Sequence, residues 1–258
     1  MDKKSSNMTV VKMFKNQALH CLAGAFPFLV LIKRYLMAAK DAWLPQKQSY
    51  SQYGEDIYVE ELLCGIKQGS CIYIDVGANQ PSQISNTYLF YRKGFRGILI
   101  EPNRELSKLC RRFREDDAFL CVGAAESAGV AEFKVGESSV TAGFSGDVKV
   151  KHTSWVPLLP VDKIWEVVGK RTPVFLFSID TEGFDLNVLL GAKETLQHAA
   201  CVVIEAKEDY REIAELLVSF NFEKTCEKGC NTIWINHENT ASLRGKKEFC
   251  KCFTHIQN

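Results

Sequence analysis

Short, continuous apolar runs alternate with amphipathic stretches from Ser51 onward. Such runs predict strands that are buried on both faces, as a parallel sheet covered by helices requires. The predicted strands are 71–76, 97–101, 118–125, 174–180 and 200–206. Apolar residues at helical spacing and capping signals predict helices over 85–94, 103–113, 185–196 and 209–220. The alternation predicts a doubly wound, mostly parallel α/β sheet.

Two segments depart from this alternation. Residues 129–160 interrupt it and predict extra strands and a loop, inserted before the fourth core strand. Residues 222–236 contain two β-rich runs joined by a Lys-Gly turn, which predicts an antiparallel hairpin at the end of the sheet. The predicted organisation is an extension over 1–50, one domain over 51–240 and a tail over 241–258.

The extension contains an apolar run over 18–32, flanked by Lys12, Lys15, Lys33 and Arg34. The run is shorter than the ~20 residues that a membrane-spanning helix needs. Basic flanks on both sides favour a segment that packs on the domain or lies at a membrane surface through residues 18–34. A cleaved signal or a spanning segment is the second interpretation.

Composition narrows the function classes. The 258 residues carry a formal net charge of +1, which gives no basic field for binding nucleic acid. Several of the ten cysteines lie in apolar runs, which favours a reducing compartment and predicts a cytoplasmic location. Cys226, Cys230, Cys250 and Cys252 lack the usual C-x2-C spacing of zinc sites, so no metal is predicted.

Acidic and small residues gather where the predicted strands end, at the edge where open α/β sheets bind ligands. They are Asp75, Gly77, Ala78 and Asn79 after the first strand, Glu101, Pro102 and Asn103 after the second, Ala124 in the third, and Asp180 and Glu182 after the fourth. Gly77 permits a tight turn, Glu101 can accept ribose hydroxyl protons, and Asp75 can neutralise a cationic group. Since no G-x-G-x-x-G motif is present, a cofactor without phosphates is favoured over NAD.

Three stretches resemble the FkbM family of S-adenosylmethionine-dependent methyltransferases. They are "SQYGEDIYVEELL" (51–63), "YIDVGANQPSQISNTYLFYRKGFRGILIEPN" (73–103) and "FSIDTEGFDLNVLLGA" (177–192), and "NTIWIN" is similar to the family's closing strand. The resemblance implies a class I methyltransferase (Rossmann-like) fold, with a seven-stranded sheet closed by a C-terminal hairpin. Asp75, Gly77 and Asn79 match the cofactor turn and Glu101 the ribose acid, while Gln52 and Asp56 match an entry segment expected to cover the cofactor.

The resemblance implies methyl transfer from S-adenosyl-L-methionine, often to a hydroxyl of a sugar, glycan or related small molecule. A hydroxyl acceptor benefits from a general base, for which Asp180, Glu182 and His152 are the candidates. The alternative hypothesis is a catalytically inactive binding module that keeps the fold, and a dehydrogenase ranks third. Cofactor binding without transfer to any acceptor would favour the inactive module.

Overall fold

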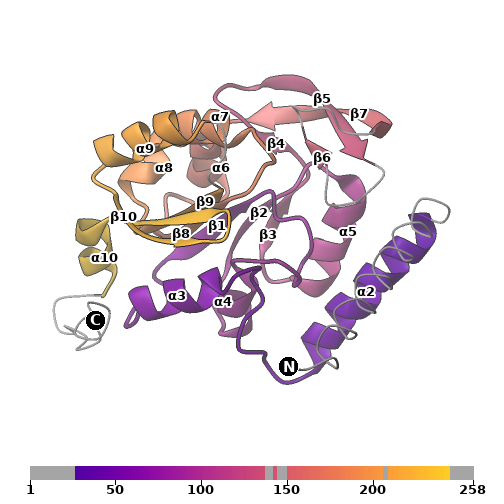
Figure 1. The fold of residues 1–258 in the computed structure, drawn as a ribbon, viewed down its shortest axis with the longest axis horizontal. Helices are drawn as coiled ribbons and strands as arrows, with labels where there is room; N and C mark the ends of the chain where they lie inside the picture. Colours follow the sequence, from indigo (N-terminus) through magenta and orange to yellow (C-terminus); the bar gives the residue numbers. More distant parts are fainter. Residues whose placement is uncertain (1–26, 137–141, 144–149, 206–208, 245–258) are drawn as a thin grey trace, which may run out of the picture.

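The computed structural model describes residues 27–136, 142–143, 150–205 and 209–244 (Figure 1). Its central sheet consists of β1 (Ile72–Val76), β2 (Gly97–Ile100), β3 (Ala118–Leu120), β8 (Val174–Ile179), β9 (Cys201–Glu205), β10 (Glu223–Lys228) and β11 (Asn231–Ile235). The order across this seven-stranded sheet is β10-β11-β9-β8-β1-β2-β3. Starting from β1, the chain adds β2 and then β3 on one side and later adds β8 and then β9 on the other side. This reversal of direction defines a doubly wound sheet.

Strand directions confirm the predicted sheet. The neighbours from β9 through β8, β1 and β2 to β3 pair in parallel. In contrast, β11 pairs antiparallel with both β9 and β10, so the hairpin predicted over 222–236 is confirmed. Val76 aligns with Ile100 on one side and with Ile179 on the other, so β1, β2 and β8 end at the same edge.

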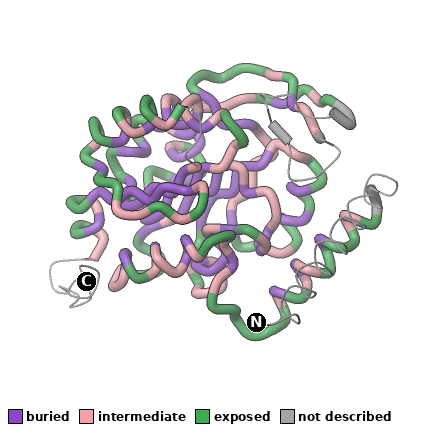
Figure 2. The backbone as a smooth tube through the Cα atoms, viewed as in Figure 1, coloured by how far each residue is buried: buried purple, intermediate pink, exposed green. Residues whose placement is uncertain are grey.

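Helices cover both faces of this sheet. They are α3 (Glu55–Leu62), α4 (Tyr88–Arg92), α5 (Arg104–Phe113), α6 (Val161–Val167), α7 (Asp185–Leu190), α8 (Lys193–Gln197), α9 (Tyr210–Ser219) and α10 (His237–Arg244). Side chains of α6 to α9 pack in one apolar cluster with the sheet, and side chains of α3, α4 and α5 pack in another. The inner strands β1, β2, β8, β9 and β11 are almost wholly buried (Figure 2), whereas the edge strands β3 and β10 are partly exposed.

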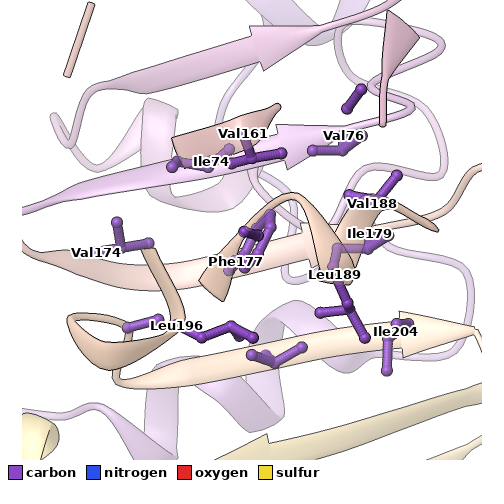
Figure 3. Packing of buried hydrophobic residues seen from close by; sticks show 14 of the residues in the cluster. Ile74, Val76, Val161, Val174, Phe177, Ile179, Val188, Leu189, Leu196 and Ile204 are labelled. Atoms are coloured by element: carbon purple, nitrogen blue, oxygen red, sulfur yellow. The ribbon is translucent and has the colours of Figure 1, made fainter. Parts of the chain in front are cut away.

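Alternation along β1 shows how the sequence builds both layers. Ile74 and Val76 belong to the cluster with α6 to α9, where they lie near Phe177 and Ile179 of β8 (Figure 3). Tyr73 points to the opposite face and packs in the other cluster. Successive side chains of a strand point to opposite faces, so a strand apolar throughout must be covered on both.

The inserted region contains extra strands, as predicted, and they form a second, smaller sheet together with β4 (Gly123–Ala124), which precedes the insertion. The inserted strands are β5 (Gly129–Gly136), β6 (Ala142–Gly143) and β7 (Val150–Leu159), and the order across this sheet is β4-β7-β5-β6. The prediction of one strand over 118–125 is wrong, because β3 pairs with β2 whereas β4 pairs with β7. The chain therefore passes from one sheet to the other between Leu120 and Gly123.

The helix predicted over 185–196 is also divided. It forms α7 and α8, which are separated at Gly191 and Ala192. A Cβ placed on Gly191 would lie 2.1 Å from the carbonyl oxygen of Ala125, so the chain requires glycine at this contact. The close approach of the backbone after β4 explains why the apolar pattern does not continue as one helix.

The N-terminal extension contributes α2 (Pro27–Trp43), which packs against α5 (Figure 1). The face of α2 turned to the domain carries Arg34, Ala38 and Asp41, all buried. Most of the apolar run 18–32 lies outside the described residues. Of the helices in the described part of the chain, none combines the length and apolar character that crossing a bilayer requires. At the other end, α10 extends past the predicted boundary at residue 240, and Arg244 donates to the carbonyl oxygen of Cys64 at 2.9 Å.

Candidate functional site

A cavity opens at the edge where β1, β2 and β8 end. Of the residues predicted for the site, the structure places eight in its lining: Gln52, Gly77, Asn79, Glu101, Pro102, Ala124, Asp180 and Glu182. They come from segments as far apart in sequence as 52 and 182, which the parallel strands bring to one edge. The chemical roles of these residues stay predictions.

The turn after β1 requires unusual backbone angles. Gly77 has φ +80°, and a Cβ there would lie 1.8 Å from the carbonyl oxygen of Asp180. Glycine therefore lets the turns after β1 and β8 cross in contact. Asn79 has φ +48°, a left-handed conformation that asparagine tolerates better than most residues. Its buried side-chain Oδ1 makes no hydrogen bond to the described residues, so the cavity wall presents an acceptor for a ligand.

Glu101 follows β2 and is 5% exposed. Its Oε2 accepts a hydrogen bond from the backbone N–H of Asn79 at 2.9 Å, and its Oε1 accepts one from the N–H of Asn103 at 2.8 Å. Burial raises the pKa of Glu101 to about 7, opposed by these two N–H groups and by Arg34. One N–H holds each oxygen in place, and each keeps a lone pair for a ligand.

This raised pKa predicts a pH-dependent stability. The carboxyl of Glu101 binds its proton more tightly in the folded chain, with a pKa of about 7 against the ordinary 4.5. Its contribution to the free energy of unfolding is therefore greatest below pH 4.5 and is lost as the pH rises to 7, by about 3 kcal/mol. Urea titrations of the wild type and Glu101→Gln at pH 5 and pH 7.5 should show most of this loss as a larger decrease in the wild type than in the variant. An equal change in both proteins would contradict the assignment.

Hydrogen bonds to the side chain of Asp185 brace the turn after β8. Asp185, buried at the start of α7, accepts from the backbone N–H of Thr181 at 2.9 Å and from its hydroxyl at 2.8 Å. It also accepts from the N–H of Gly183 at 3.3 Å. Asp180 is half-buried at the cavity wall and Glu182, at φ +56°, is exposed at its mouth. The brace fixes both carboxylates relative to the turn after β1.

Helix α2 supports the loop that follows this first turn. Asp41 accepts a hydrogen bond from the hydroxyl of Ser82 at 2.9 Å and another from the side-chain amide of Gln83. Gln83 and the neighbouring Ile84 line the cavity. The extension therefore contributes to the shape of the site, although it precedes the predicted domain.

Five predicted site residues remain, and the described side chains among them lie outside this lining. Asp56 lies in the first turn of α3 and accepts a hydrogen bond from the hydroxyl of Ser49 at 2.6 Å. Asn103 is the N-cap of α5. Ala78 is buried in the apolar cluster of α3 to α5. His152 lies in β7, paired with Val135, and its side chain is outside the described part of the chain. Asp56, Ala78 and Asn103 are not part of the cavity lining.

Asp75 is the fifth, and it points into the layer of α4 and α5. Its Oδ2 accepts from the hydroxyl of Thr87 and lies 3.9 Å from Nη1 of Arg114. Burial raises the pKa of Asp75, opposed by Arg114 and Thr87. Arg114 also donates to Asp117 at 2.8 Å. Asp75 thus belongs to a buried charge network beneath the cavity floor rather than to the lining.

Other lining residues were not predicted. Gln80, Gln83 and Ile84 follow the turn after β1, Phe133 comes from β5 of the inserted sheet, and Cys230 precedes β11. A signal for Phe133 exists in the alternation of "GVAEFKVG", which makes it the inward residue of β5, 3% exposed. The approach of the hairpin to this cavity has no local signal in the sequence.

The charged residues described in the cavity wall are all acidic. Glu101, Asp180, Glu182 and Glu205 line it, and among the described lining residues there is no Lys, Arg or His. Such a wall favours a ligand with cationic groups and hydroxyl donors and disfavours phosphates. The described residues also contain no group of three or more His, Cys, Asp or Glu that is able to hold a metal ion. Cys250 and Cys252 lie outside the described residues.

The sheet order, the antiparallel β11 and the cavity at the carboxyl edge define a class I methyltransferase fold. The family model of the methyltransferase FkbM domain matches residues 75–224, more than half of the chain. The chain belongs to the FkbM methyltransferase family. No curated protein sequence matches significantly.

Solved structures similar to this chain include three methyltransferases. Methyltransferase FkbM from Methylobacillus flagellatus KT is 17% identical, with a TM-score of 0.45 over 66% of this chain and 44% of that chain. A TehB-like SAM-dependent methyltransferase from Corynebacterium glutamicum is 10% identical, with a TM-score of 0.38 over 71% and 88%. A putative O-methyltransferase from Klebsiella pneumoniae is 9% identical, with a TM-score of 0.41 over 80% and 90%. The chain therefore spans less than half the length of the first of these proteins.

Proposed function

We propose that this chain is an S-adenosyl-L-methionine-dependent methyltransferase that transfers a methyl group to a hydroxyl oxygen of a sugar, glycan or related small molecule. The observation that carries the proposal is the carboxylate-lined cavity, which has no cationic side chain among its described lining residues. S-adenosylmethionine has a sulfonium, an ammonium, one carboxylate and ribose hydroxyls but no phosphate. NAD, whose pyrophosphate would face these carboxylates, fits poorly.

The residues present fit this cofactor. Glu101, held by two backbone N–H groups, would bind the ribose hydroxyls. Asn79 offers a buried, unpartnered Oδ1 to a donor such as an amino group. S-adenosylmethionine supplies the activated methyl group, and the protein must align the acceptor hydroxyl with it and remove the hydroxyl proton. Asp180, half-buried and fixed by the braced turn, is the stronger candidate for that base, while the exposed Glu182 would bind the acceptor.

The first test is cofactor binding by calorimetry with the native protein. We expect saturable binding of S-adenosylhomocysteine and no binding of NAD. Absence of S-adenosylhomocysteine binding would contradict the proposal. Binding accompanied by no transfer in a broad panel of glycans and hydroxylated small molecules would favour the inactive binding module.

The second test concerns the base. Asp180→Asn should lower the rate of methyl transfer by about 10² or more, because general-base catalysis typically contributes 10²–10⁴-fold. Binding of S-adenosylhomocysteine should change by no more than about threefold, since an asparagine keeps the shape of the wall. The assay supplies a deuterated-methyl cofactor to native extract, identifies the labelled product by mass spectrometry, and compares initial rates.

Asp209→Asn is the matched control, because Asp209 is exposed at the start of α9 and away from the cavity lining. It should transfer methyl groups at the wild-type rate. An Asp180→Asn enzyme as fast as the wild type would exclude Asp180 as the base.

A further inference from the structure

Helix α2 carries apolar side chains on the side that faces away from the domain as well as on the side that packs on it. The side turned to the domain carries Arg34, Ala38 and Asp41. At about 100° per residue, the opposite side carries Leu29, Ile32, Leu36 and Trp43, which we call the outer stripe. A surface helix of a globular protein normally turns its apolar stripe toward the core. The described residues therefore leave the outer stripe largely uncovered.

The outer stripe is exposed over its whole length. Leu29 is 51% exposed, Leu36 is 61% and Trp43 is 87%, and Figure 2 shows α2 at the edge of the molecule with many exposed positions along it. Contiguous apolar side chains of this kind mark an interaction site more often than isolated ones do. Lys33 and Lys40, both exposed, lie along one border of the stripe, as basic residues do on helices that lie in a membrane interface.

Charge is distributed unevenly between this segment and the rest of the chain. Residues 1–40 contain seven Lys or Arg and one acid, Asp2, for a net charge of +6. The chain as a whole has 32 basic and 31 acidic residues, so residues 41–258 hold 25 and 30 and carry −5. The first 40 residues of this nearly neutral protein thus form a basic segment of the sequence. Such a segment is attracted to anionic lipid and is repelled by a second, similarly basic copy.

A groove beside Trp43 adds a second cationic feature. Arg92, Arg96 and Arg112 line it together with aromatic rings, and Glu115 and Asp116 lie at its acidic end. Arg96 is paired with Asp116 at 2.8 Å. Arg92 donates to the carbonyl oxygens of Asp41 and Leu44, which orient its guanidinium without neutralising its charge, and Arg112 is exposed. Trp43 borders both the outer stripe and the groove.

We propose that the outer stripe docks α2 flat onto an anionic phospholipid membrane surface, with lipid headgroups at the arginine-lined groove. Leu29, Ile32, Leu36 and Trp43 enter the boundary between headgroups and acyl chains. Headgroup phosphates and carboxylates are contacted by Lys33, Lys40 and Arg112. This arrangement leaves the inner face of α2 on the domain, where Asp41 holds the loop of the cavity. The proposal is independent of the proposed enzymatic activity.

The test is flotation of the full chain with phosphatidylcholine vesicles that contain or lack 30 mol% phosphatidylserine. We expect at least about tenfold tighter binding to the anionic vesicles, weakened by 0.5 M salt. Leu36→Ser/Trp43→Ser should lower this binding at least about tenfold, since it removes the two most exposed apolar side chains. Arg112→Ala should weaken it about threefold or more. Brominated acyl chains should quench fluorescence in the wild type and less in Trp43→Phe.

Trp155→Ser is the matched control, because Trp155 is 74% exposed on β7 of the second sheet. It should bind vesicles as the wild type does. Wild-type protein that remains at the bottom of the gradient and does not float with the anionic vesicles overturns the proposal. So does an outer-stripe variant with normal vesicle binding but a lower melting temperature or an altered sedimentation coefficient, because the stripe would then be covered by residues 1–26 or by a second copy.

Discussion

Glu101→Ala is expected to lower the affinity for S-adenosylhomocysteine by at least about 100-fold. The carboxylate would accept both ribose hydroxyls, and hydrogen bonds to a charged group contribute about 1.5–3 kcal/mol each. Losing two of them costs about 3 kcal/mol or more, and 1.4 kcal/mol corresponds to a factor of ten. The change also frees the backbone N–H groups of Asn79 and Asn103, which now bond to Glu101. Isothermal titration calorimetry at pH 8 measures the effect.

The affinity measurement for Glu101→Ala is accompanied by a control variant and by a pH series on the wild type. Glu105→Ala changes an exposed acid on the first turn of α5, paired with Lys108 at the surface, and should alter affinity by less than about twofold. Burial raises the pKa of Glu101 to about 7, so wild-type affinity should fall as the pH is lowered from 8 to 6 and protonates the acceptor. Glu101→Ala that is folded by circular dichroism and binds like the wild type would remove Glu101 from the cofactor site.

Hydrophobic patterning predicted the inner strands of the central sheet well because they are buried on both faces. Runs such as 71–76 and 174–180 match β1 (Ile72–Val76) and β8 (Val174–Ile179) to within a residue or two at each end. The pattern says nothing about the partner of each strand, however. Residues 118–125 are apolar throughout, but the first part joins β2 and the last part joins β7. Sheet membership depends on long-range pairing, which no local run of residues encodes.

The candidate site was predicted in part for the same reason. Strands that end at one edge must bring their final residues together, so Gly77, Glu101 and Asp180 could be placed from sequence. Asp75 was assigned to the same site because it stands at the end of a strand. Side chains alternate along a strand, and Asp75 lies on the face opposite Val76, toward Arg114. Its charge partner Arg114 is 39 positions away, in a stretch with three arginines. The sequence alone does not show which of the three pairs with Asp75.

Arg114→Met is expected to destabilise the protein by about 3–5 kcal/mol. Arg114 is 1% exposed, donates to Asp117 at 2.8 Å and to Thr87 at 2.9 Å, and lies 3.9 Å from Asp75. Its guanidinium also faces the ring of Tyr73 at 5.2 Å. Removing the cation leaves two buried carboxylates without their counter-charge, and breaking a buried pair from one side typically costs this much. Urea denaturation followed by circular dichroism measures the loss.

Two further variants separate the charge of Arg114 from its shape. Arg114→Lys keeps the cation but loses the planar fork, so it should cost less than Arg114→Met and should fold even if the methionine variant does not. Arg112→Met, two residues away and exposed, should change stability by no more than about 0.5 kcal/mol. Adding Asp117→Asn to Arg114→Met should recover part of the loss, because one unpaired carboxylate is removed while an acceptor for the Tyr73 hydroxyl remains. Additive losses in that double variant would mean that Arg114 stabilises the fold by packing rather than by balancing the acids beneath the cavity.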